Sequence, residues 1–247
     1  MTEIPPSWTS TARRDQVKAD PAPIPVVLAE PPAPIGSVLL VHGRNGAPEQ
    51  VQIAEIARAY LARGWRVVAP ELPHSLALPR SGPPGGISFA GHVRAAAQVW
   101  DWMAGRWPDR PRALAGHSIG GYAVAHLGAG SDAHHVLAVS PPMSGMVLYR
   151  ARQAMGEAAL DEVRREAPGY FDEMRLADAE PALRRLAAPL AVVTGAEDGL
   201  VRLADARAYF TAAPNGRFFG ALPGQHHCPA GAACGQMLAV ALASLGA

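Results

Sequence analysis

Apolar residues along the chain fall into two alternating patterns. Short runs rich in Val, Leu and Ala predict strands, and longer segments with apolar residues three and four positions apart predict helices. The predicted strands are 24–30, 36–43, 65–70, 112–117, 134–141, 188–195 and 217–222. The predicted helices are 48–63, 90–107, 119–128, 202–213 and 229–245, with a loop over 72–89 and an irregular helical stretch between 141 and 189.

The order of these elements predicts a particular kind of sheet. Strands that alternate with helices favour a mostly parallel sheet with helices on both faces, and the inner runs are apolar throughout, as expected when both faces are covered. The first two runs are separated only by "PPAP" and a few neighbours, which predicts a hairpin. Functional sites in such sheets form at the carboxyl ends of the strands, so the residues after each strand carry most of the functional information.

Length and composition suit a single domain and limit the classes of partner that it can be expected to bind. The chain has 247 residues, of which 49% are hydrophobic, and a mean hydropathy of +0.05, which fits a single α/β domain over residues 1–247. The net charge of +1 comes from 22 basic and 21 acidic residues that are interspersed, so no nucleic-acid or anionic-membrane partner is expected. Nothing in the composition indicates an oligomeric state.

The chain carries no mark of export. Its N-terminal residues contain no apolar leader-like run, and no apolar run approaches the roughly 18 residues that cross a bilayer. The only cysteines are Cys228 and Cys234, too few for a disulfide framework. We therefore expect a soluble cytoplasmic protein.

One serine stands between glycines at the end of a predicted strand. Residues 116–120 read "GHSIG", with Ser118 two positions from both Gly116 and Gly120. Between an apolar strand and a helix, this spacing predicts a sharp turn that exposes the serine hydroxyl at the helix N-terminus, where glycines avoid steric clash. A glycine-rich turn with a merely solvated serine is the weaker reading. We expect His117, beside this serine, to pack beneath the turn rather than to catalyse.

The segment "HGRNG", residues 42–46, follows another predicted strand. A turn there can aim the backbone N–H of Arg44 at a reacting carbonyl, and the N–H of Ile119 can act as the second donor of an oxyanion hole. We expect the ring of His42 to brace this loop instead of taking part in the chemistry.

Acidic and imidazole side chains follow the last two predicted strands. Asp198 stands in "GAEDGLV", with Glu197 as a less suitable alternative, and either carboxylate alone could simply cap a turn or helix. His226 and His227 stand in "PGQHH", and histidine suits the role of general base. The chain order Ser118, Asp198, His227 is one in which convergent serine hydrolases arrange their triads.

These motifs together resemble the α/β-hydrolase fold family, in its esterase-like serine hydrolases. The matching segments are "HGRNG", "GHSIGG", "TGAEDGLV" and "LPGQHH". The resemblance implies Ser118 as nucleophile, Asp198 as acid, and His227 or His226 as base. The family's P-G-x-x-H spacing places the base at His227, whereas a shorter P-G-x-H spacing would place it at His226.

Two segments depart from the family or vary within it. "ELPHSLALP" puts Glu71 where the family usually has aspartate, so we expect the loop to be shaped differently and to help form the substrate pocket. The insertion at about 142–187 falls where this fold carries a cap over the active site. Its methionines, Met143, Met146, Met155 and Met174, suggest a permissive apolar pocket, although they would equally suit an ordinary helix core.

The function expected from this resemblance is hydrolysis of a small or medium carboxylic ester through an acyl-enzyme, with no cofactor. A metal is not expected, because His226, His227, Cys228 and Cys234 fit no zinc-binding spacing. A thioesterase, an acyltransferase, a carbon–carbon bond hydrolase or a peptidase of the same fold are alternatives. A catalytically inactive binding module is an alternative of another class, since fold alone does not determine chemistry.

Overall fold

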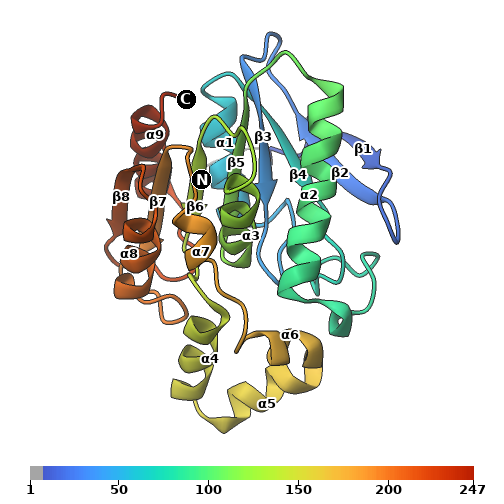
Figure 1. Cartoon of the computed structure of the whole chain (residues 1–247). Helices are drawn as coiled ribbons and strands as arrows, with labels where there is room; N and C mark the ends of the chain where they lie inside the picture. Colours follow the sequence, from blue (N-terminus) through green and yellow to red (C-terminus); the bar gives the residue numbers. More distant parts are fainter. Residues whose placement is uncertain (1–7) are drawn as a thin grey trace, which may run out of the picture.

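The computed structural model describes residues 8–247, so the first seven residues of the N-terminal stretch considered above lie outside the described residues. An eight-stranded sheet runs through this part of the chain in the order β1-β2-β4-β3-β5-β6-β7-β8 (Figure 1). Its strands are β1 (Arg13–Val17), β2 (Ile24–Ala29), β3 (Gly36–Val41), β4 (Trp65–Pro70), β5 (Arg112–His117), β6 (Val136–Val139), β7 (Leu190–Gly195) and β8 (Gly216–Leu222). β2 is antiparallel to β1 and β4, and the pairs from β4 to β8 are parallel.

Helices cover both faces of this sheet. The long ones are α1 (Val51–Leu61), α2 (Phe89–Arg106), α3 (Ile119–Gly128), α8 (Leu203–Ala212) and α9 (Ala232–Ser244). Side chains of β3 alternate between two cores: Val38 and Leu40 join the core that contains α1 and α9, whereas Leu39 and Val41 join the core that contains α2, α3 and α8. The predicted α/β architecture is confirmed, and the observed limits lie within about three residues of the predicted ones.

The predicted hairpin between the first two runs is wrong. β2 pairs with β1 and β4, while β3 lies between β4 and β5, so the "PPAP" connection crosses β4 instead of making a tight turn. β4 is buried at every residue, and the apolar run of β3 needs neighbours on both edges as well as covering on both faces. β1, whose sequence RRDQV is largely polar and exposed, is an edge strand that the hydrophobic pattern does not reveal.

A helical lobe leaves the sheet between β6 and β7. It comprises residues 145–177 and carries α4 (Gly145–Ala154), α5 (Glu157–Glu166) and α6 (Pro168–Glu173), and Figure 1 shows these helices apart from the layers around the sheet. The two chain segments at its base pair with each other, because Gly145 N–H donates to Ala177 at 2.9 Å and Ala179 N–H donates to Met143 at 2.8 Å. The next helix, α7 (Glu180–Leu183), returns to pack against α3 and α8.

None of the helices within residues 8–247 is both long and apolar enough to cross a membrane.

Candidate active site

Ser118 occupies a strained turn between β5 and α3. Its φ of 56° and ψ of −126° lie in a region that residues with side chains rarely adopt. The flanking glycines are sterically required: a Cβ on Gly116 would lie 2.3 Å from the carbonyl oxygen of Gly120, and a Cβ on Gly120 would lie 2.1 Å from that of Val41. The strand, the turn and the helix therefore fit together only with glycine at both positions.

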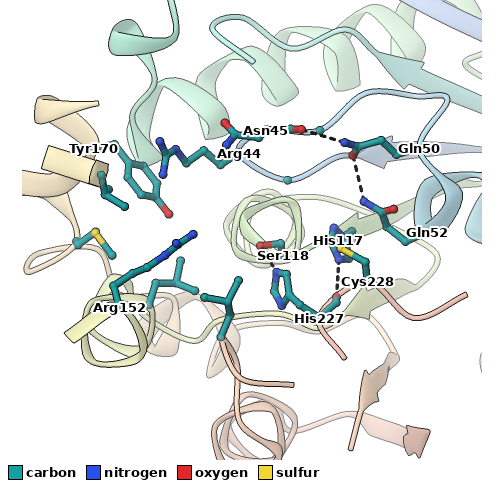
Figure 2. Close-up of a pocket in the computed structure, with 16 residues that line it drawn as sticks. Arg44, Asn45, Gln50, Gln52, His117, Ser118, Arg152, Tyr170, His227 and Cys228 are labelled. Carbon is teal, nitrogen blue, oxygen red and sulfur yellow. Dashed lines mark hydrogen bonds between the residues drawn. The ribbon is translucent and has the colours of Figure 1, made fainter. Parts of the chain in front are cut away.

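A continuous hydrogen-bonded chain runs from Ser118 through His227 to Asp198. The Oγ of Ser118 lies 2.9 Å from Nε2 of His227, and Nδ1 of His227 lies 2.8 Å from Oδ2 of Asp198; Figure 2 shows the contact between Ser118 and His227. Since a carboxylate can only accept, Nδ1–H donates to Asp198, and Nε2 is left to accept the hydroxyl hydrogen of Ser118. The three residues follow β5, β7 and β8, so the sheet brings together side chains that are far apart in the sequence.

Asp198 orients His227 and also stabilises its own loop. Its side chain is fully buried, and Oδ1 accepts the backbone N–H groups of Leu200 at 2.8 Å and Val201 at 2.9 Å. Burial alone would raise the pKa of Asp198, but the hydrogen bond and charge of His227 and the two N–H donors outweigh it and lower that pKa. Asp198 is therefore a carboxylate that uses one oxygen for the loop and the other for His227.

His226 and Glu197 face away from this chain of contacts. His226 is exposed and donates from Nδ1 to the carbonyl of Glu197 at 2.8 Å, and the Glu197 carboxylate accepts the N–H of Gly224 at 3.0 Å. Both residues thus join the loop after β7 to the loop after β8. Of the two adjacent histidines, only His227 hydrogen-bonds to Ser118 and Asp198.

His117 has a contact that the sequence does not reveal. Its Nε2–H donates to the backbone carbonyl of His227 at 2.9 Å. Burial, above all, lowers the pKa of His117 to about 3, and the neighbouring His227 lowers it further, so the ring is neutral near pH 7. The position of His117 beside Ser118 was the one sequence signal for a role at the site. The sequence does not indicate its partner, His227, which lies 110 residues further along the chain.

The loop after β3 runs directly beside Ser118. A Cβ on Gly43 would lie 3.1 Å from the Cβ of Ser118. The backbone of the next residue, Arg44, therefore starts beside Ser118. His42 holds this loop, because its Nε2 accepts the N–H of Leu72 at 3.1 Å and its carbonyl accepts from His92 at 2.8 Å.

The two backbone N–H groups expected to bind an oxyanion have no hydrogen-bond acceptor within residues 8–247. They belong to Arg44 in this loop and to Ile119, the first residue of α3. A free N–H at the start of a helix is usual, because it has no partner inside the helix. Both groups therefore remain available to a ligand.

A cavity of about 190 Å³ opens at Ser118 (Figure 2). The lobe supplies one wall through residues Leu148, Arg152, Val163, Tyr170 and Met174. Of the four methionines expected to line a cap, only Met174 does so, and Met155 is more than half exposed.

The loop that follows Glu71 does not line this cavity. Its residues instead border a second cavity of about 690 Å³, and the Glu71 carboxylate pairs with Arg14 of β1. The expectation that this loop shapes the pocket at Ser118 is therefore wrong. Arg14 lies on β1, the strand that the hydrophobic pattern does not reveal, and it holds the Glu71 carboxylate outside the cavity at Ser118.

The chain was compared with models of protein families and with the sequences of curated proteins. A model of the alpha/beta hydrolase family matches residues 38–239. No curated protein sequence matches the chain significantly.

Solved structures share the fold at low sequence identity. Est1E from Butyrivibrio proteoclasticus is 16% identical with a TM-score of 0.73, covering 95% of this chain and 99% of that one. The esterase domain of a Rhodothermus marinus protein is 18% identical with a TM-score of 0.67, covering 93% and 95%. A serine hydrolase homologue from Coxiella burnetii is 15% identical with a TM-score of 0.64, covering 95% and 96%. The match over residues 38–239 shows that the chain belongs to the alpha/beta hydrolase family.

Proposed function

We propose that this protein is a serine hydrolase that cleaves small or medium carboxylic esters through an acyl-enzyme. The observation that carries the proposal is the hydrogen-bonded chain from Ser118 through His227 to Asp198, in which the tautomer of His227 leaves Nε2 free to take a proton. This chain ends at a strained serine that borders a cavity.

The chemistry follows from these contacts. The Oγ of Ser118 attacks the ester carbonyl while Nε2 of His227 takes the hydroxyl proton. The buried carboxylate of Asp198 stabilises the imidazolium that forms. The N–H groups of Arg44 and Ile119 donate to the oxyanion, and each such donor is worth about 10²–10³ in rate.

The alcohol leaves before water enters the reaction. The imidazolium of His227 gives its proton to the leaving alcohol, and the acyl group stays on Ser118. A water molecule, deprotonated by His227, then attacks the acyl-enzyme; the bond to Ser118 breaks, His227 returns the proton to the Oγ of Ser118, and the carboxylic acid is released. The cycle requires no cofactor.

Two solved neighbours support an ester as the substrate. One is an esterase domain, and Est1E has been solved with ferulic acid bound, with a TM-score of 0.76 to this chain. The small volume of the cavity also suits a short substrate better than a bulky one. A thioesterase, an acyltransferase, a carbon–carbon bond hydrolase and a peptidase would use the same residues, and a panel of esters, thioesters and amides separates them.

Labelling and turnover test the proposal together. A fluorophosphonate should add to Ser118 by peptide mass analysis, and p-nitrophenyl butyrate should be hydrolysed. Ser118→Ala should abolish the adduct and lower kcat by about 10⁴ or more, whereas Ser244→Ala, at the far end of α9, should leave both intact. An inactive binding module would show neither turnover nor adduct, and an adduct on Ser75, Ser81 or Ser140 would contradict the assignment.

A further inference from the structure

A cationic and polar group of side chains lines the cavity at the end opposite Ser118. Arg44 reaches toward this end from the loop after β3, Arg152 from α4, and Tyr170 from α6. Figure 2 shows the guanidinium of Arg152 and the hydroxyl of Tyr170 directed into the same space, which Ser118 and His227 border from the other side. The side chains come from three separate elements, so their meeting is a property of the fold.

One of the two guanidinium groups at this end is unpaired among the residues that the structure describes. Arg44 pairs with Glu166 of α5 at 2.7 Å and lies over the ring of Tyr170, with its carbon Cζ 5.2 Å from the ring centroid. Arg152 is half-buried, yet its guanidinium makes no ion pair or hydrogen bond with any residue that the structure describes. The other nearby carboxylate, Glu173, already accepts from the backbone N–H groups of α2.

Tyr170 presents a donor without a protein partner. The residue is 3% exposed, and its hydroxyl makes no hydrogen bond within residues 8–247. Burial raises the pKa of Tyr170, although the nearby charges of Arg44 and Arg152 oppose this shift, so the phenol keeps its proton. This hydroxyl and the half-buried guanidinium of Arg152 both border the cavity without protein partners, so a ligand in the cavity can hydrogen-bond to both.

The charges and walls of the cavity define the ligand. Arg44 is paired with Glu166, so Arg152 is the guanidinium at this end of the cavity that is free to bind a single carboxylate. Guanidinium binds a carboxylate through paired N–H donors, and a phenol can donate a further hydrogen bond. The walls of the cavity also include Leu148, Val163 and Met174, which suit a few methylene groups.

We propose that the ester cleaved at Ser118 carries a carboxylate that Arg152 and Tyr170 bind, separated from the ester by a short hydrocarbon chain. This inference rests on the proposed function and narrows its substrate class. The carboxylate belongs either to the acyl part, as in the half-ester of a short dicarboxylic acid, or to the alcohol part, as in the ester of a short hydroxy acid. The recognising chemistry is the same in both.

Matched pairs of substrates test the inference. On the acyl side, monomethyl glutarate is compared with methyl 4-carbamoylbutanoate; on the alcohol side, 3-(butanoyloxy)propanoate is compared with 3-(butanoyloxy)propanamide. Within each pair only a carboxylate is exchanged for a neutral amide of the same shape. At pH 7.5 we expect kcat/KM to favour the carboxylate by about tenfold to hundredfold in at least one pair, the range of a charge-assisted hydrogen bond.

Variants locate the cause of that preference. Arg152→Gln should reduce the ratio of the two kcat/KM values to near one, mainly through KM, and Tyr170→Phe, which removes a single oxygen, should reduce it in part. Arg150→Gln removes the same charge from an exposed position on the same helix and should keep the wild-type ratio. A preference that survives Arg152→Gln, or falls equally in Arg150→Gln, would overturn the assignment.

Two further outcomes separate this inference from the proposed function. If wild-type protein turns over both members of both pairs equally well, the carboxylate site is wrong while the hydrolase stands. If no ester is cleaved, calorimetric titration of Ser118→Ala with monomethyl glutarate still decides: binding that disappears with Arg152→Gln supports the site, and no binding overturns it.

Discussion

The imidazole of His117 donates a hydrogen bond to the backbone carbonyl of His227 at 2.9 Å. His117, the residue before Ser118, therefore holds His227, whose ring hydrogen-bonds to Ser118. The two rings lie with their centroids 5.1 Å apart. Because His117 ends β5 while His227 stands on an otherwise irregular loop, the contact ties that loop to the rigid centre of the sheet.

Removal of this contact should slow catalysis without preventing folding. His117→Phe keeps an aromatic ring but loses the donor, and we expect kcat to fall about tenfold or more with little change in KM, because small displacements of a reacting group are costly. His117→Gln, whose amide nitrogen has a similar reach, should restore most of the rate. Equal losses in both variants, together with equal losses in melting temperature, would indicate a packing role alone.

The two adjacent histidines should differ sharply in their effects. His227→Ala should abolish fluorophosphonate labelling of Ser118, because a serine hydroxyl without its base is a weak nucleophile. His226→Ala loses only a bond to the carbonyl of Glu197 and should keep at least about a tenth of the activity. Measurement of kcat/KM for both variants on p-nitrophenyl butyrate decides, and the reverse order would place the base at His226.

The neighbouring acids give a similar matched pair. Asp198→Asn keeps the shape but turns an acceptor for Nδ1–H of His227 into an amide, which favours the wrong tautomer, so kcat should fall by about 10⁴. Glu197→Gln preserves an acceptor for the N–H of Gly224 and should cost much less. Steady-state kinetics on both variants tests this, and a larger loss for Glu197→Gln would identify it as the acid.

Local patterns in the sequence were sufficient to predict the turn at Ser118 and the alternation of strands and helices that indicates a parallel sheet. Both depend on residues close together in the chain. The contact between His117 and His227, and the meeting of Arg152 with Tyr170, depend on how separate elements pack. No periodicity or spacing reports that packing. The wrong hairpin has the same origin: the sequence shows that β2 and β3 are strands, but not that β4, later in the chain, inserts between them.

The glycine requirement at the turn can be tested by stability. Gly120→Ala would place a Cβ 2.1 Å from the carbonyl of Val41 at the end of the central strand β3, which cannot move without disturbing the sheet. We expect a large loss of melting temperature or failure to fold. Gly105→Ala, at an exposed helical position with nothing within 4 Å of the new Cβ, is the control and should stabilise slightly, by about 0.5–1 kcal/mol. Equal melting temperatures for the two variants would show that the turn tolerates a side chain.

Buried histidines should make the fold sensitive to acid. Burial is the main cause that lowers the pKa values of His42, His117 and His135 to about 3 and that of His92 to about 4, whereas histidine in an unfolded chain titrates near 6.5. Between these values the unfolded state binds more protons than the folded state. The free energy of unfolding therefore rises with pH up to about 6.5, and it is lost as pH falls from there toward 4.

Each of these histidines contributes a slope of up to about 1.4 kcal/mol per pH unit within that window. Urea unfolding between pH 8 and 5 should accordingly show a stability that is nearly constant above pH 7 and falls steeply below 6.5. In His92→Gln the side chain no longer titrates, and an amide can still donate to the carbonyl of His42. The number of protons taken up on unfolding near pH 5.5 should therefore be smaller by about one, which lowers the slope of the unfolding free energy against pH. An unfolding free energy that stays flat from pH 7.5 to 5 would mean that the folded protein protonates these rings, and that their burial does not exclude the charged form.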